Sequence, residues 1–338
     1  MFNSLKLALI ALTAAYVLAG SGQQAEARNV PGSASAGILQ LVEPATDDVL
    51  GGMVGSVRSA LRFDGAQVSV RRGVGDGSPL TMTNFGYGTG DGGFVFGSLN
   101  YRRYELDTEV EADIVTGSLG FGRTINSRVA IFGAIIGEST TAETPFNNGT
   151  LDNTGVGLSF GLDYVVSEPF VITATAGNFW YVYDVTRNGG AVTGSFDSTR
   201  QFVDLRGSMT HDFSGFDLQT SFGVRYIRQQ DSSYRESGGA LVGEAEYERV
   251  VGFGEGRLLF DGPADFTPYL AADARVVGVS DDLPPGATAI DVPTLHGGLG
   301  FGVVSHWQGG DFDLGVRANT SEEGFTGYEA AFGINLRF

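Results

Sequence analysis

The sequence predicts an all-β protein, an antiparallel transmembrane β-barrel of twelve strands in a bacterial outer membrane, with a short N-terminal helix in or under its pore. Three observations support this prediction. The chain opens with a secretory signal, its last strand alternates apolar and polar residues, and short turns alternate with longer polar loops. Because successive side chains of a strand point to opposite faces, this alternation gives a sheet one apolar and one polar face.

Residues 1–27 have the features of a signal peptide. Lys6 precedes an apolar stretch, and Ala25 and Ala27 fit the small-x-small cleavage rule. We therefore expect the mature chain to start at Arg28. The apolar stretch is shorter than the ~20 residues that a membrane-spanning helix needs, which disfavours an uncleaved anchor.

Composition limits the possible functions. The net charge of −18 argues against nucleic-acid binding, which needs a basic surface. The chain contains no cysteine, so it has no disulfides and no thiolate metal ligands. A mean hydropathy of +0.03 and 52 glycines suit a barrel. They also suit a soluble all-β protein, so composition alone does not separate the two. We predict no cofactor and no metal site.

Residues 28–93 are expected to form an N-terminal region of linker, helix and glycine-rich segment. Over residues 46–62, apolar residues recur at helical spacing. Thr46 can cap the start of this helix, and Arg58 and Arg62 suit the negative charge of its C-terminal end.

The rest of the N-terminal region has less regular patterns. Residues 66–72 fit a short strand, and 73–93 fit a loop. We expect the helix to lie inside the barrel or just beneath it and to block most of the conductance. Removal of residues 28–65 should then raise the conductance.

The barrel itself is expected over residues 94–338, where strand patterns repeat. The predicted strands are 94–104, 113–123, 128–139, 153–166, 170–185, 200–212, 216–229, 245–260, 266–279, 291–307, 311–319 and 325–338. Short turns between them alternate with longer loops at 105–112, 140–152, 186–199, 230–244, 280–290 and 320–324. Transmembrane barrels have short periplasmic turns and long outer loops, and an even number of strands returns the C-terminus to the periplasm.

In the predicted strand segments 216–226, 268–276 and 311–319, the charged residues share one face. In 311–319, for example, Leu314 and Val316 face lipid while Asp313 and Arg317 face inward. A charge on the lipid face would cost about 2–4 kcal/mol at mid-membrane. The expected lumen charges are Asp204, Arg206, Arg225, Glu255, Arg257, Asp273, Arg275, Asp313, Arg317 and Arg337. They fit either a pore lining that selects solutes or, as we favour, a static salt-bridge network.

The last residues resemble the C-terminal insertion signal of outer-membrane proteins. Gly333, Leu336 and Phe338 match that pattern, and Ala331 replaces its polar residue. The whole expected signal is Tyr328, Phe332, Gly333, Ile334, Leu336 and Phe338. The resemblance implies the barrel-assembly machinery and outer-membrane lipid as partners, and deletion of Phe338 should sharply reduce assembly.

Acidic residues concentrate in the predicted outer loops. Loops 105–112 and 280–290 contain carboxylates and no arginine. Carboxylate oxygens are ligands for Ca²⁺ or Mg²⁺, which can bridge to lipopolysaccharide, a further expected partner. A solvated surface that opposes aggregation explains them more simply. If the pore opens, we expect it to prefer cations.

Residues 94–338 are similar to the β-domain, or translocator, of autotransporters. The resemblance is carried by residues 116–122, 157–164, 267–270 and the closing strand. It implies a twelve-strand barrel threaded by an N-terminal helix. Autotransporters carry a long exported passenger before the barrel, whereas about sixty residues separate the expected cleavage site from residue 94. We therefore expect a non-catalytic translocator-type barrel without a sizeable passenger.

Two alternatives to a translocator stay open. One is a small-solute outer-membrane channel. The other, which we favour least, is a barrel hydrolase that uses His211, His296 or His306. Ser305 and His306 are adjacent in one strand, so they point to opposite faces and cannot form a nucleophile–base hydrogen bond. No catalytic residue is predicted.

Overall fold

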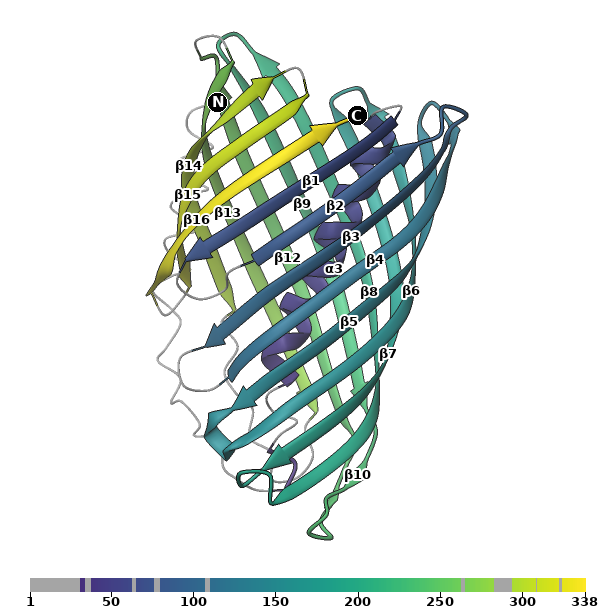
Figure 1. Cartoon of the computed structure of the whole chain (residues 1–338), viewed down its shortest axis with the longest axis vertical. Coiled ribbons are helices and arrows are strands. Elements are labelled where there is room, and N and C mark those ends of the chain that lie inside the picture. Colours follow the sequence, from purple (N-terminus) through teal and green to yellow (C-terminus); the bar gives the residue numbers. More distant parts are fainter. Residues whose placement is uncertain are drawn as a thin grey trace.

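The computed structural model describes residues 31–33, 38–62, 65–75, 80–106, 110–262, 265–282, 294–307, 309–321 and 324–338. The predicted signal peptide, with Ala25 and Ala27, lies outside these residues. Within them, fourteen antiparallel strands form a closed barrel around one long helix (Figure 1). The described helices include none that is long and apolar enough to cross a membrane.

The barrel strands follow one another around the wall in chain order. They are β1 (Gly65–Gly75), β2 (Leu80–Gly88), β3 (Gly93–Leu106), β4 (Val110–Asn126), β5 (Val129–Thr144), β6 (Gly149–Ser167), β7 (Phe170–Arg187), β8 (Val192–Phe213), β9 (Phe216–Asp231), β12 (Ala245–Phe260), β13 (Phe266–Asp282), β14 (Leu295–Trp307), β15 (Gly310–Ser321) and β16 (Gly324–Arg337). β16 pairs with β1 and closes the barrel. A small hairpin of β10 (Tyr234–Arg235) and β11 (Leu241–Val242) lies between β9 and β12, and a short 3₁₀ helix, η1 (Pro145–Asn147), follows β5.

The prediction of twelve strands is wrong, because the barrel contains two more strands before residue 94. The expected strand at 66–72 is the middle of β1, and part of the expected loop at 73–93 is β2. β2 lies against the helix, and a Cβ atom on Gly86 would come within 2.7 Å of the backbone nitrogen of Ala60. The glycine that makes this segment resemble a loop is therefore required by close packing.

Parts of the expected long outer loops are also strand. The connection between β7 and β8 spans only residues 188–191, instead of 186–199. β8 has 22 residues, whereas about 9–11 suffice to cross a membrane. Strands β5 to β8 therefore extend the wall well beyond the bilayer, at the end of the barrel marked by β10 in Figure 1.

The connections and the C-terminus orient the barrel. Tight turns join β4 to β5, β6 to β7 and β8 to β9 at the end where Phe338 donates its backbone N–H to the carbonyl of Ala66, at 2.9 Å. Outer-membrane barrels place short turns in the periplasm. The end with Phe338 is therefore periplasmic, and the end with the β10–β11 hairpin is extracellular.

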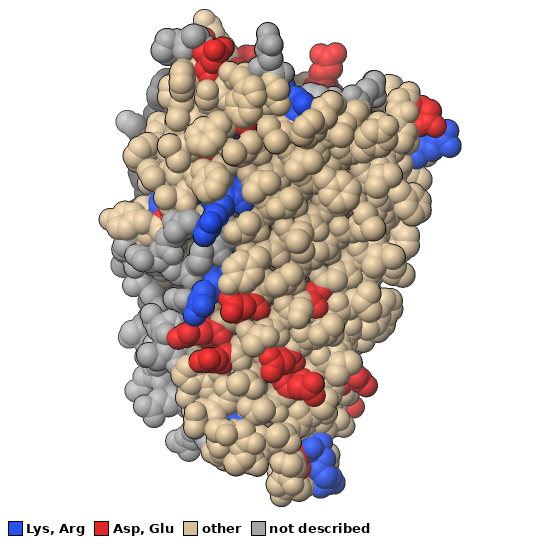
Figure 2. All heavy atoms as spheres, viewed as in Figure 1, with Lys and Arg blue, Asp and Glu red and all other residues tan. Residues whose placement is uncertain are grey.

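The outer surface of the barrel has an apolar belt. Outward side chains such as Leu119, Phe121, Phe160 and Leu299 are exposed by 59–74%. Figure 2 shows an uncharged surface over most of this face, with acidic residues gathered closer to the extracellular end. A surface of this kind is suited to lipid contact.

Candidate functional site: the occupied lumen

The helix α3 (Ile38–Arg62) occupies the lumen (Figure 1). It begins eight residues before the predicted start. It also contains Pro44, a residue that usually ends a helical sequence pattern. Asp48 pairs with Arg102 on β3, and Ser56 donates to the carbonyl of Gly97, at 2.7 Å. The helix thus runs antiparallel to β3, from the extracellular end to the periplasmic end, as far as the start of β1.

Small residues allow the helix to lie directly on the wall formed by β2 and β3. A Cβ atom on Gly52 would come within 2.7 Å of Ser98 Oγ and Asn100 Nδ2. The Nδ2 of Asn100 donates to the carbonyl of Asp48, at 2.7 Å. The helix is therefore held off-centre, against one side of the barrel.

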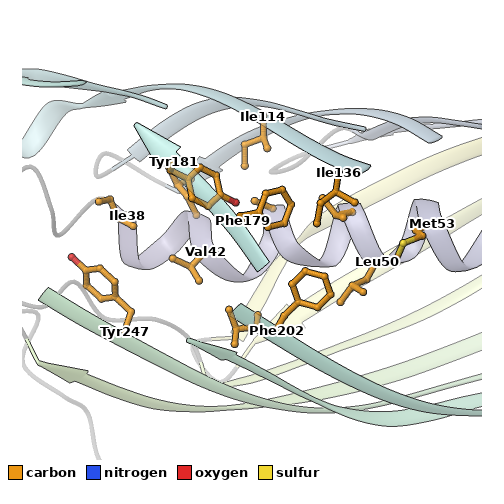
Figure 3. Packing of buried hydrophobic residues seen from close by; sticks show 14 of the residues in the cluster. Ile38, Val42, Leu50, Met53, Ile114, Ile136, Phe179, Tyr181, Phe202 and Tyr247 are labelled. Carbon is orange, nitrogen blue, oxygen red and sulfur yellow. The ribbon is translucent and has the colours of Figure 1, made fainter. Parts of the chain in front are cut away.

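Apolar and aromatic side chains fill the extracellular half of the lumen around the helix (Figure 3). Ile38 and Val42 of α3 pack among side chains of the surrounding wall. The wall residues Phe179, Tyr181, Tyr183, Phe202 and Tyr247 are exposed by at most 2%. The rings of Tyr183 and Phe196 stack with centroids 5.1 Å apart. This half of the lumen is a hydrophobic core.

A buried ion pair lies within this core. Arg200 Nη1 is 2.8 Å from Glu138 Oε2, and each side chain is 1% exposed. Tyr181 donates its hydroxyl to Glu138 at 2.9 Å, and Gln229 accepts from Arg200 Nε at 2.8 Å. The sequence analysis did not identify this pair. The available signal was Glu138 itself, a charged residue that directly follows the apolar run 129–137 of β5.

Ion pairs also connect the helix to the far side of the barrel. Asp47 accepts from Arg225 on β9 at 2.8 Å, and Arg225 also pairs with Asp204 at 3.0 Å. Glu43 pairs with Arg275 on β13 at 2.7 Å. Charges on two separate strands therefore fix the helix across the lumen.

The periplasmic half contains a cavity of about 960 Å³ beside the helix. Periplasmic residues such as Ser127 and Glu168 line its mouth, and Arg58 of α3 lines one wall. We call this cavity the vestibule. Arg257 pairs with Asp313 at 2.9 Å on its wall, and these two side chains are 27% and 38% exposed. The vestibule is thus polar and partly solvated.

The structure places the predicted lumen charges inside the barrel, mainly as pairs between strands. Arg317 pairs with Asp273 at 2.6 Å, Glu255 lines the vestibule, and Arg337 pairs with Asp311. The pair Arg206–Asp204, at 3.7 Å, instead joins two charges of one strand. Sequence spacing showed which residues share a face, but not which residues pair.

The predicted insertion residues lie in β16 or directly after it. Tyr328, Phe332, Ile334, Leu336 and Phe338 are exposed by 36–78%, and Gly333 lies opposite Arg71 of β1. The last strand therefore lies beside the first, and its aromatic face points out of the barrel. The role of these six residues in membrane insertion stays a prediction.

The structure shows the neighbours of two of the histidines, His306 and His211. His306 Nδ1 lies 2.8 Å from Asp311, while the neighbouring Ser305 belongs to the opposite face. The ring of His211 contacts that of Phe213, with centroids 4.5 Å apart. Among the described residues, no three of His, Cys, Asp or Glu are grouped as metal ligands.

A closed antiparallel barrel with an apolar outer belt and a charged interior defines an outer-membrane β-barrel protein. Within that class, the model of the autotransporter β-domain family matches residues 95–282, which is more than half of the chain. The chain belongs to this family. No curated protein shows a significant sequence match.

Solved structures show the same fold at low sequence identity. The translocator domain of the autotransporter NalP from Neisseria meningitidis matches with a TM-score of 0.57 and 15% identity, over 89% of this chain and 99% of that one. The CymD monoaromatic hydrocarbon channel matches with 0.53 and 10%, over 93% and 94%. A deltaS2S3 mutant of the TodX monoaromatic hydrocarbon channel matches with 0.51 and 10%, over 84% and 93%.

Proposed function

We propose that this barrel exports its own N-terminal segment to the cell surface and then keeps α3 in the pore as a plug, without catalysis. The direction of α3 supports this proposal. The predicted secretory signal would deliver the chain to the periplasm, yet the helix begins at the extracellular end of the lumen. The segment before the helix must then have crossed the barrel.

Contacts at the extracellular rim support the same topology. Gly32 donates its N–H to Glu236 in the β10–β11 hairpin, at 3.3 Å, and Asn147 of η1 donates to Ser33, at 3.3 Å. Arg187 holds the Glu236 carboxylate through Nε and Nη2. These contacts hold the chain where it leaves the barrel, on the outer side.

Cysteine labelling tests this topology, because the chain has no cysteine of its own. Pro31→Cys should react in intact cells with a polyethylene-glycol maleimide too large to cross the outer membrane. Ser233→Cys, in the extracellular loop, is the positive control, and Ser127→Cys, in a periplasmic turn, is the negative control. Labelling of Pro31→Cys only after permeabilisation would place the segment in the periplasm and refute the proposal.

The size of the exported segment stays a prediction. We propose that no sizeable passenger accompanies this barrel. The mass of the mature protein extracted from outer membranes would check this. A mass well above that of residues 28–338 would contradict it.

The vestibule supports a second candidate, a small-solute channel. A polar cavity that opens to the periplasm is one half of such a path, and two of the similar structures are channels. The filled extracellular half favours the plug. Swelling of liposomes that contain the full-length protein, in sugar solutions, would favour the channel.

A barrel hydrolase is the least supported function. If His211→Ala or His296→Ala removed a measured lipid or protein hydrolysis, the non-catalytic proposal would be wrong. We expect neither variant to change such a background activity.

A further inference from the structure

The outer wall carries the same four-residue arrangement at two places. In each, a tyrosine and an arginine two residues apart on one strand face two carboxylates on the next strand. We call these arrangements the outer brackets. The first consists of Tyr101 and Arg103 on β3 with Glu111 and Asp113 on β4, and the second of Tyr226 and Arg228 on β9 with Glu246 and Glu248 on β12.

The first bracket is held by a hydrogen bond and an ion pair. Tyr101 donates its hydroxyl to Asp113 Oδ1 at 2.6 Å. Arg103 Nη2 lies 3.6 Å from Glu111 Oε2. In the strand register, Arg103 is directly opposite Asp113.

The second bracket repeats this register. Tyr226 donates to Glu248 Oε1 at 2.5 Å, and Arg228 is directly opposite Glu248. Arg228 Nε and Nη2 donate to Glu246 at 3.0 and 2.8 Å. This geometry leaves Nη1 of Arg228 for a further acceptor.

Both brackets lie where the apolar belt ends. Towards the periplasm, the nearest outward residues around the first bracket are Leu99 and Val115, which are exposed. Val224 and Val250 take the same places beside the second. Tyrosine is typical of this boundary, because its ring is apolar and its hydroxyl is polar. The brackets are six strands apart in a ring of fourteen described strands, and thus lie nearly opposite each other.

We propose that the two outer brackets bind phosphate groups of lipopolysaccharide in the outer leaflet. The surface is continuous with the lipid-contacting belt, so the headgroup of a lipid on that belt lies at the level of the brackets. A guanidinium group pairs well with phosphate, and the arginine side chains are 46% and 37% exposed. Glu111 and Glu246 hold the guanidinium groups at the wall. The tyrosine hydroxyls donate to the neighbouring carboxylates of Asp113 and Glu248. Two opposite sites then set the depth and tilt of the barrel.

Titration of rough lipopolysaccharide into the full-length protein in detergent, followed by native mass spectrometry, tests this. The double variant Arg103→Gln/Arg228→Gln should bind about tenfold more weakly for each arginine removed. Arg123→Gln is the matched control, because Arg123 is an exposed arginine near the periplasmic end of β4. Heat-modifiable migration would show that each variant is folded.

A double Lys variant tests whether a positive charge is enough for binding or whether the planar guanidinium group is needed. Arg103→Lys/Arg228→Lys should keep part of the affinity, and it remains available if the Gln double variant does not fold. Equal affinity of parent and Gln variant, or an equal loss in Arg123→Gln, would overturn the proposal. Binding of phosphatidylglycerol with the same affinity would overturn the assignment to lipopolysaccharide. Binding that requires Mg²⁺ and ignores both arginines would assign the carboxylates instead.

Discussion

The two halves of the lumen differ in how they hold the same helix. In the extracellular half, α3 is enclosed by aromatic rings, and even the ion pair Arg200–Glu138 is buried. In the periplasmic half, the helix packs on β2 and β3, and the polar vestibule lies beside it. Arg58 makes polar contacts from this part of the helix to β7 and β8, because it donates to Thr173 Oγ1 at 3.1 Å and to Ser208 Oγ at 2.9 Å. A helix that packs closely on one wall alone leaves space beside it, so the seal of this barrel is in its extracellular half.

This difference assigns separate roles to the charges of the lumen. A buried charge must keep its partner, since an unpaired one costs several kcal/mol. A partly exposed pair is solvated and contributes little. Charges of the extracellular half should therefore determine stability, whereas those of the vestibule should determine mainly the electrostatic environment of any solute that enters.

The largest effect is expected from removal of the helix. Deletion of residues 28–62 keeps β1 complete but removes the helix that fills the extracellular half. Conductance in planar bilayers should rise well above that of the full-length protein, because the rings that pack on α3 lose their support. Equal conductance of the two proteins would show that the seal does not depend on the helix.

The next largest effect is expected in the buried ion pair. Arg200→Ala leaves the Glu138 carboxylate buried without its cation and should lower the free energy of unfolding by about 3–5 kcal/mol. Denaturant unfolding of the detergent-solubilised barrel measures this. Arg123→Ala, at an exposed position, is the control and should change it by less than about 0.5 kcal/mol. If the two variants lost similar amounts of unfolding free energy, the ion pair would not be buried in a hydrophobic core.

The sequence predicted the parts of the fold that depend on periodicity. Alternation located the strands after residue 94 and the inward face of Asp313 and Arg317, because one face meets lipid and the other meets water. The same rule failed where this contrast is absent. Gly86 faces the helix and made β2 resemble a loop. β5 was nevertheless predicted as a strand, at 128–139, although inward residues such as Phe132 and Ile136 pack in the core. Partners such as Arg200 and Glu138 come from separate strands, β8 and β5, so sequence spacing did not reveal them.

A smaller effect is expected where the helix meets β2. Gly86→Ala introduces a Cβ atom 2.7 Å from the backbone of Ala60, so the helix or the strand must shift. Overpacking of this kind costs about 1–3 kcal/mol. Gly252→Ala is the matched control in β12, because a Cβ atom there meets nothing within 4 Å. Unfolding midpoints of both variants measure the difference, and a neutral Gly86→Ala would mean that α3 does not press on β2.

The smallest effect is expected in the vestibule. Asp313 pairs with Arg257 and accepts a hydrogen bond from Tyr269 at 2.9 Å, but its side chain is 38% exposed. Water can replace both partners, so Asp313→Ala should lower the free energy of unfolding by at most about 1 kcal/mol. Asp313→Asn keeps an acceptor for Tyr269 and separates the loss of charge from the loss of the hydrogen bond. If Asp313→Ala destabilised the barrel as much as Arg200→Ala, the periplasmic half would be as tightly packed as the extracellular half, and the contrast between the two would fail.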